Sequence, residues 1–252
     1  MALASGQGPC AHADRDASGN PVNFAWFGNA PTVTLSLGVT TVDHRDSYTG
    51  TRTTDARIIT ENTARVQITT DDFKEANAVL ATFGAATAIT GSSVTNEAVL
   101  STVPVVGERY FLQATGRVSA LTLKGNAVTI PTTKYTVDAS GVIVFSDVSG
   151  IAAPITADYT VAASRQVGFF KTAPPERYIR QVILNTATSV SGDYARAVLE
   201  LFKVRMNPVE DLGLINNEFM ALTLNGAALI DEKRTAASAT GQFGRIIYFD
   251  AV

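Results

Sequence analysis

The stretch that decides the fold runs from Pro31 to Thr70, "PTVTLSLGVTTVDHRDSYTGTRTTDARIITENTARVQITT". Before its charged middle, apolar side chains alternate with hydroxyl side chains: Val33, Leu35 and Leu37 against Thr32, Thr34 and Ser36. After the middle, a second run alternates in the same way: Ala64, Val66 and Ile68 against Arg65, Gln67 and Thr69. A period of two residues is that of a β-strand. The stretch therefore predicts two long strands joined by a long polar loop, from Val42 to Ile58.

The next segment, "DDFKEANAVLATFG", has a helical period instead. Its apolar residues are spaced three and four apart, at Phe73, Ala76, Leu80 and Phe83. Asp72 with Glu75 three residues later resembles a capping box, and Gly84 suits a helix C-terminus. We expect one helix over residues 72–83, packed on a sheet.

From Ala88 to Arg165 charged residues become rarer and turns become frequent. "LTLKGNAVTI" indicates a hairpin around Gly125-Asn126, and "KYTVDASGVIVF" indicates another around Asp138–Gly141. This texture predicts a small antiparallel subdomain at 88–165, inserted into a β-domain made of 1–87 and 166–252. One continuous barrel is the alternative. Long strands return afterwards, and in "ARAVLELFKVRM" apolar groups occupy both faces, which is typical of a strand inside a sandwich or at an interface.

Composition narrows the class of protein. Of 252 residues, 46% are hydrophobic and only 17% are charged, whereas an average soluble domain has about 25% charged residues. A chain this poor in charge is either rich in β-structure or hides extra surface in an oligomer. The net charge of −3 and the lack of Lys/Arg blocks disfavour specific nucleic-acid binding.

The lone cysteine, Cys10, excludes an internal disulfide and fits synthesis in a reducing cytoplasm. The first residues have no basic stretch followed by an apolar core, so no secretory signal is expected. Apolar runs are also too short for a membrane span. These features predict a soluble chain without a membrane span.

Histidine is the first place to look for chemistry, and the chain has two. His12 lies in "CAHAD" with Cys10, but no second Cys/His cluster completes a four-ligand zinc site. His44 lies between Asp43 and Asp46 in "DHRD", yet neighbours in an extended chain point in different directions. A polar arm and a self-compensating charged loop are the simpler interpretations.

No other pattern indicates catalysis. Glu210 and Asp211 are adjacent carboxylates, more typical of a turn after Pro208 than of a glycosidase or calcium site. The chain contains no G-x-S-x-G elbow, P-loop or dinucleotide fingerprint. We therefore expect no enzyme and no cofactor or metal.

The order of parts, an N-terminal arm, two long strands around a charged loop, a helix and late long strands, resembles the major tail tube proteins of long-tailed, non-contractile bacteriophages. Two segments carry the likeness most specifically, "DHRDSYTGTRTTDARI" and "LFKVRMNPVEDLGLINNEFMALTLNGAALID". The resemblance implies a mainly β fold, two packed antiparallel sheets with a flanking helix. It also implies hexameric rings whose inner strands join into one β-barrel.

The resemblance further implies how such a chain works. The rings stack into a tube around a tape measure protein, end at tail terminator and distal tail or baseplate proteins, and later pass viral DNA. The expected location is the virion tail, after synthesis in the host cytoplasm. An acidic subunit suits a conduit that does not bind its DNA specifically.

In such proteins the loop between the two long strands reaches the adjacent ring. On that implication the contact residues are Asp43, Arg45, Asp46, Tyr48, Gly50, Arg52 and Asp55. Two other functions stay open. One is a different structural virion protein, such as a decoration or baseplate-hub protein. The other is a carbohydrate-binding β-sandwich, in which Trp26 would stack on a sugar.

Overall fold

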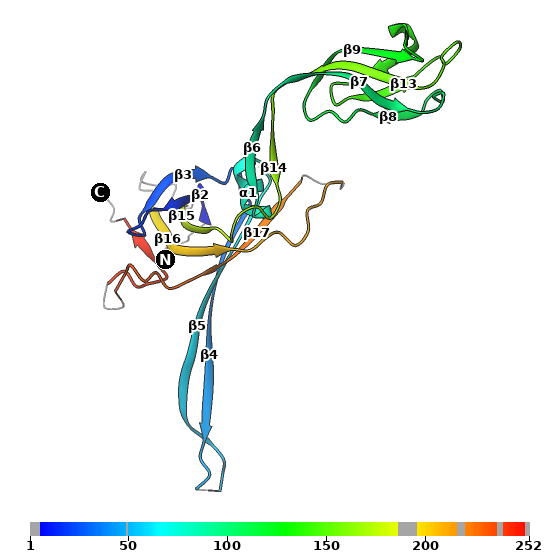
Figure 1. Ribbon diagram of the computed structural model, residues 1–252. Coiled ribbons are helices and arrows are strands. Elements are labelled where there is room, and N and C mark those ends of the chain that lie inside the picture. Colours follow the sequence, from blue (N-terminus) through cyan, green and yellow to red (C-terminus); the bar gives the residue numbers. More distant parts are fainter. Residues whose placement is uncertain (1–5, 49, 186–195, 216–219, 236–238, 250–252) are drawn as a thin grey trace. The chain divides into compact units, whose positions relative to one another are not determined.

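The computed structural model describes residues 6–48, 50–185, 196–215, 220–235 and 239–249. The chain divides into two compact units, one formed by Met1–Ala85 with Val167–Val252 and the other by Ala86–Gln166. The sequence placed these boundaries at 88 and 165. Two paired strands, β6 (Ala85–Ile89) and β14 (Ser164–Gly168), carry the chain between the units. Figure 1 shows the elements of both units.

Unit 1 contains a nine-stranded sheet. Its strands are β1 (Gly6–Gln7), β2 (Cys10–Arg15), β3 (Pro21–Trp26), β4 (Thr32–Arg45), β5 (Thr54–Thr70), β15 (Glu176–Asn185), β16 (Arg196–Met206), β17 (Leu222–Ala228) and β18 (Gly244–Tyr248). The main order is β3-β2-β15-β16-β17-β5-β4, and β1 and β18 pair with β15 and β16. The strand pairs of the sheet are antiparallel in the described residues, because the chain returns by hairpins and loops rather than by crossover helices.

The expected mainly β class with one helix is confirmed for the described residues. The prediction of two packed sheets is wrong for unit 1, whose long strands form a single sheet. β16 explains the difference, because one of its edges serves two partners: Ala197 lies opposite Tyr248 of β18, and Val204 lies opposite Ala228 of β17. The sheet packs most of its buried residues in one core, to which strands distant in sequence contribute Ile68, Ile179 and Leu224. A smaller separate cluster consists of Ala13, Tyr178 and Phe202.

The helix α1 (Glu75–Thr82) is shorter than the predicted 72–83. Asp72 does not cap it; Lys74 is the N-cap residue and makes no side-chain cap hydrogen bond. Gly84 does donate its N–H to the Val79 carbonyl, and Phe83 holds the left-handed turn at φ 48°. The predicted stripe is also partly wrong, because Phe73 is exposed and the buried face is Asn77, Ala78, Leu80 and Ala81.

Unit 2 has two small sheets around its own core. The first has the order β10-β9-β13-β7, with β7 (Ser92–Leu100), β9 (Val118–Gly125), β10 (Val128–Thr129) and β13 (Ile155–Val161). The second has the order β11-β12-β8, with β8 (Arg109–Phe111), β11 (Tyr135–Val137) and β12 (Val142–Phe145); a 3-10 turn, η1 (Thr132–Lys134), precedes β11. Ile143, Phe145 and Leu123 are fully buried in this core.

Both predicted hairpins of unit 2 are present, with one shift. The tight turn after β9 is formed by Asn126 and Ala127, which both have positive φ, rather than by Gly125-Asn126. Two successive positive φ values are those of a type I′ turn. The second turn lies at Asp138–Gly141 as expected, where the Asp138 carboxylate accepts the N–H groups of Ser140 and Val142.

Candidate functional site

The outer half of the β4–β5 hairpin is the most unusual surface of unit 1. Ala64, Val66 and Ile68 of β5 are buried in the core, whereas β5 is exposed from Thr54 to Asn62. β4 pairs with β5 along its whole length and with no other described strand. The outer hairpin is therefore a two-stranded ribbon that extends beyond the core (Figure 1).

Apolar side chains continue along this ribbon on the face that covers the core further back. Leu37 lies opposite Ala64, Val39 opposite Asn62, and Thr41 opposite Ile59. Leu37 is 76% exposed, Val39 58% and Ile59 60%. The strand period that partly buries Val33 and Leu35 thus runs on past the edge of the core, where the apolar side chains stay exposed. Part of this face forms an apolar crevice of about 250 Å³ beside Phe243.

The predicted long loop from Val42 to Ile58 is mostly strand. β4 continues to Arg45 and β5 begins at Thr54, which leaves a tip of residues 46–53. The charges in the strands explain why: Asp43 lies opposite Arg57 and accepts two hydrogen bonds from its guanidinium, at 2.6 and 3.1 Å. A cross-strand pair of opposite charges stabilises the register of an antiparallel ladder.

His44 makes a second pair within the hairpin. Its Nδ1 lies 2.6 Å from Oδ1 of Asp55. The hydrogen bond from Arg57 lowers the pKa of Asp43, and the hydrogen bond from His44 lowers the pKa of Asp55. Asp43 and Asp55 therefore already have partners in their own chain. Within the described residues, no nucleophilic side chain bonds His44, so this pair lacks the third group that a hydrolytic triad needs.

The hairpin tip consists of the described residues 46–48 and 50–53. It is closed by the Asp46 N–H donating to the Thr53 carbonyl at 2.9 Å. Tyr48 is 97% exposed, and both Gly50 and Arg52 have positive φ, at 75° and 50°. A positive φ is uncommon outside glycine, so the turn constrains Arg52. Of the predicted contact residues, the structure gathers Asp46, Tyr48, Gly50 and Arg52 at the tip, and places the others in the adjoining strand ends.

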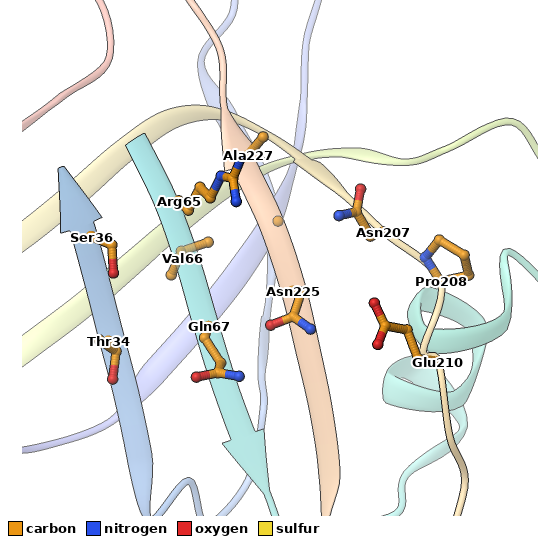
Figure 2. Close-up of a pocket in the computed structure, with 11 residues that line it drawn as sticks. Thr34, Ser36, Arg65, Val66, Gln67, Asn207, Pro208, Glu210, Asn225 and Ala227 are labelled. Carbon is orange, nitrogen blue, oxygen red and sulfur yellow. The ribbon is translucent and has the colours of Figure 1, made fainter. Parts of the chain in front are cut away.

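Sequence reasoning missed a polar groove at the other end of the same strands. It has a volume of about 540 Å³ and lies between the outer face of β4, β5 and β17 and the segment after β16 (Figure 2). Thr34, Gln67 and Asn225 form a row across its floor, because they are cross-strand neighbours. Asn207, Pro208 and Glu210 form its wall. The alternation of β5 indicated a polar face, but only the pairing with β17 creates the groove.

The groove contains two charges without ion pairs. Within the described parts of the chain, neither Arg65 nor Glu210 has an opposite charge within 4.0 Å. Glu210 lies where the sequence predicted a turn, in a segment without helix or strand after Pro208. Arg52 at the tip and Arg45 at the end of β4 likewise have no ion pair with a described residue.

A comparison with family models identifies the family to which the chain belongs. Residues 3–247 match the model of a family described as "Protein of unknown function UCP028589". The chain belongs to this family. No curated protein sequence matches it. The family description names no activity, so the function of this family member has to be argued from the hairpin and the groove.

In this family member the other candidate residues lie apart from both features. Cys10 and His12 are buried in β2 against the core, where burial raises the pKa of the Cys10 thiol to about 12. No three His, Cys, Asp or Glu side chains gather as a metal site within the part of the chain that the structure describes. None of the described helices could span a membrane. Trp26 is half exposed, and the Lys74 ammonium lies over its ring at 4.7 Å.

Proposed function

We propose that the chain is a structural subunit that assembles with copies of itself into the stacked hexameric rings of a phage tail tube. The observation that carries this proposal is the uncovered apolar face of the β4–β5 hairpin. Leu37, Val39 and Ile59 are exposed in an isolated subunit, and an apolar surface of this kind is typical of a protein–protein contact.

The ribbon has little stability of its own, because a two-stranded hairpin is at best marginally stable by itself in water. This one continues beyond the core from Leu37 to Arg45, without a further described strand on either edge. Burying each large apolar side chain against a neighbour stabilises the assembly by roughly 1.5–3 kcal/mol. Contacts with other copies would therefore order the ribbon and remove its apolar face from water.

The sheet edges support the same proposal. β3 and β4 are the two ends of the main strand order in unit 1. An edge strand as long as β4 is a template for pairing with another chain unless something covers it. A closed ring in which each subunit covers the edge of the next satisfies all edges by one heterologous contact. The continuous barrel implied by the resemblance is such a ring.

The identity of the assembly rests on the resemblance to tail tube proteins. The resemblance implies the tape measure protein, the tail terminator and the distal tail or baseplate proteins as partners, and the virion tail as the location. It also implies that viral DNA passes through the tube without specific binding. The net charge of −3 supports the last point, since a conduit with surplus cations would bind DNA phosphates.

Negative-stain microscopy of the purified protein at high concentration tests the proposal. We expect rings or tubes from the unmodified chain. The double variant Leu37→Ser/Val39→Ser is expected to stay folded and to assemble poorly, because it changes only side chains that the isolated subunit exposes. Val128→Ser, at an equally exposed position in unit 2, is the matched control.

The outcomes separate the alternatives. Discrete particles that never lengthen would favour a decoration or baseplate-hub protein. A monomer that stays monodisperse at every concentration, with the double variant behaving identically, would contradict self-assembly. Binding in a glycan screen that is lost in Trp26→Ala would favour the carbohydrate-binding alternative.

A further inference from the structure

The groove and the hairpin tip lie at opposite ends of the same two strands; the groove contains Glu210 and Arg65, and the tip contains Arg52. We infer that the groove beside Glu210 receives the hairpin tip of a second copy of this chain. This inference rests on the proposed function and adds to it the acceptor surface of the contact between stacked rings.

Position is the first argument. The groove takes Thr34 and Ser36 from the start of β4, whereas the tip begins after Arg45, where β4 ends. A donor and an acceptor at opposite ends of one element cannot meet in the same subunit. They join identical copies head to tail, and a heterologous contact of this kind extends into an open stack when its rotation does not close a ring.

Charge is the second argument. The tip offers one cation, Arg52, and the adjoining end of β4 offers another, Arg45; neither has an ion pair with a described residue. The groove wall offers the carboxylate of Glu210, which is exposed and equally without an ion pair among the described residues. Glu210 and Arg52 are thus the pair we assign to the contact.

Chemistry and size are the third argument. The groove floor presents hydroxyl and amide groups from Thr34, Gln67 and Asn225, which can bond the polar backbone of a turn. Its volume of about 540 Å³ lies within the range of roughly 300–1,000 Å³ found for pockets that enclose a drug-sized ligand. A turn of small polar residues around Tyr48 is a matching occupant.

The geometry also fixes a repeat distance. Asp46 follows Thr34 by 12 residues, and a strand rises about 3.3 Å per residue, which gives about 40 Å. For a hairpin that runs along the stacking axis, docking of the tip in the groove of the next copy sets the spacing of stacked copies at about 40 Å.

Charge reversal tests the inference. We expect Glu210→Lys and Arg52→Glu each to reduce tube formation at least tenfold while leaving the subunit folded, as judged by circular dichroism. The double variant is expected to recover tubes, because the pair is restored with the signs exchanged. Asp211→Lys, which changes the neighbouring exposed carboxylate outside the groove, is the control.

A crosslinking experiment measures the contact directly. Arg52→Cys and Glu210→Cys subunits are mixed and treated with a short bismaleimide. Since Cys10 is buried and its thiol is hardly ionised, we expect a covalent dimer from the mixture and much less from either variant alone. The double cysteine variant is expected to give a ladder of oligomers.

Failure of this inference and failure of the proposed function look different. Normal tubes from both charge-reversal singles, or a tube repeat far from 40 Å, would overturn the groove as acceptor while tube formation itself stands. If the unmodified chain forms no assemblies and the mixed cysteine variants give no crosslink, both the groove contact and the proposed function are contradicted.

Discussion

At the scale of single residues, His12 is a histidine held in its neutral form by the core. Its ring lies 4.8 Å from that of Phe27, it is 6% exposed, and neither ring nitrogen has a hydrogen-bond partner in the described residues. Burial lowers its pKa to about 4, and the nearby charge of Arg177 adds to the effect. An imidazolium here would be buried without a carboxylate partner, which is costly.

His12 therefore makes stability depend on pH. Its pKa of about 4 in the fold lies below the 6.5 of the free side chain, so the unfolded chain binds the proton first. Stability is lost as the pH falls from 6.5 to 4, by about 3 kcal/mol in total. Urea unfolding of His12→Leu is expected to show this loss removed. His44→Leu, at an exposed histidine, should keep it; an unchanged pH profile in His12→Leu would contradict the assignment.

Asn77 is a buried polar residue that the helical pattern did not single out. Its amide nitrogen donates to the carbonyls of Phe27 and Asp72, both at 2.8 Å. These bonds attach α1 to the chain that leads out of β3. Local periodicity could not reveal this role, because the partners lie up to 50 residues away.

Removing the Asn77 amide should weaken unit 1. We expect Asn77→Ala to lower the free energy of unfolding by about 2 kcal/mol, since two hydrogen bonds are lost and the Asp72 carbonyl loses a donor. Chemical denaturation measures the change. Asn62→Ala, at an exposed asparagine on the hairpin, is the control and should alter stability very little. Equal effects at the two positions would disprove the role of the buried amide.

At the scale of elements, the β4–β5 hairpin separates folding from assembly. Its inner half packs on the core through Val66 and Ile68, and its outer half touches no other described strand. Changes at the tip should therefore leave the subunit intact. The two ion pairs, Asp43 with Arg57 and His44 with Asp55, hold the strand ends in register up to the tip.

Deletion of residues 47–53 tests this separation. We expect the shortened chain to fold with unchanged thermal stability and to form no tubes, because it has lost the tip but none of the core. Microscopy and thermal unfolding are the two measurements. Normal tubes from the deletion would refute a role for the tip, and an unfolded product would show that the tip is needed for folding. Replacing the exposed turn residues Asn126 and Ala127 of unit 2, which both have positive φ, by glycine is the control for tube formation.

At the scale of the whole molecule, each of the two units has its own core. The clusters around Ile68 and Leu224 in unit 1 and around Ile143 and Phe145 in unit 2 share no residue. A segment with a core of its own can fold alone. The chain leaves unit 1 after α1 and returns before β15, so unit 2 is an insertion that interrupts no strand of the nine-stranded sheet.

We therefore expect residues 86–166 to fold when produced alone. The isolated segment should unfold cooperatively in urea and show the near-ultraviolet signal of its packed tyrosines, Tyr135 and Tyr159, which are buried in this core. Phe145 is fully buried, and replacing it by Ala should abolish the cooperative transition of the segment. A noncooperative, unstructured segment would show that unit 2 depends on unit 1.

The long strands, the helix and the inserted unit could be predicted from the sequence, because strand and helix periods depend on residues close together in the chain. The alternation around Val33 and Val66 predicted two long strands, and the change of texture near Ala88 predicted an inserted unit. The position of the helix was predicted, but its predicted start was wrong. The Asp72 carbonyl accepts a hydrogen bond from the Asn77 amide, and the Asp72 side chain does not cap the helix. The length of the charged loop was wrong because cross-strand pairing of Asp43 with Arg57 extends the strands.

The sequence by itself determined the β class, the single helix among the described elements and the polar and apolar faces of β5. Only the tertiary structure decided which apolar residues stay exposed and that His44 pairs with Asp55. It also decided that Glu210 lines one groove with Gln67 and Asn225. The physical reason is that a period of two assigns each side chain to a face within its own strand. Whether that face meets a core, a partner or water depends on the register and order of strands far apart in the chain.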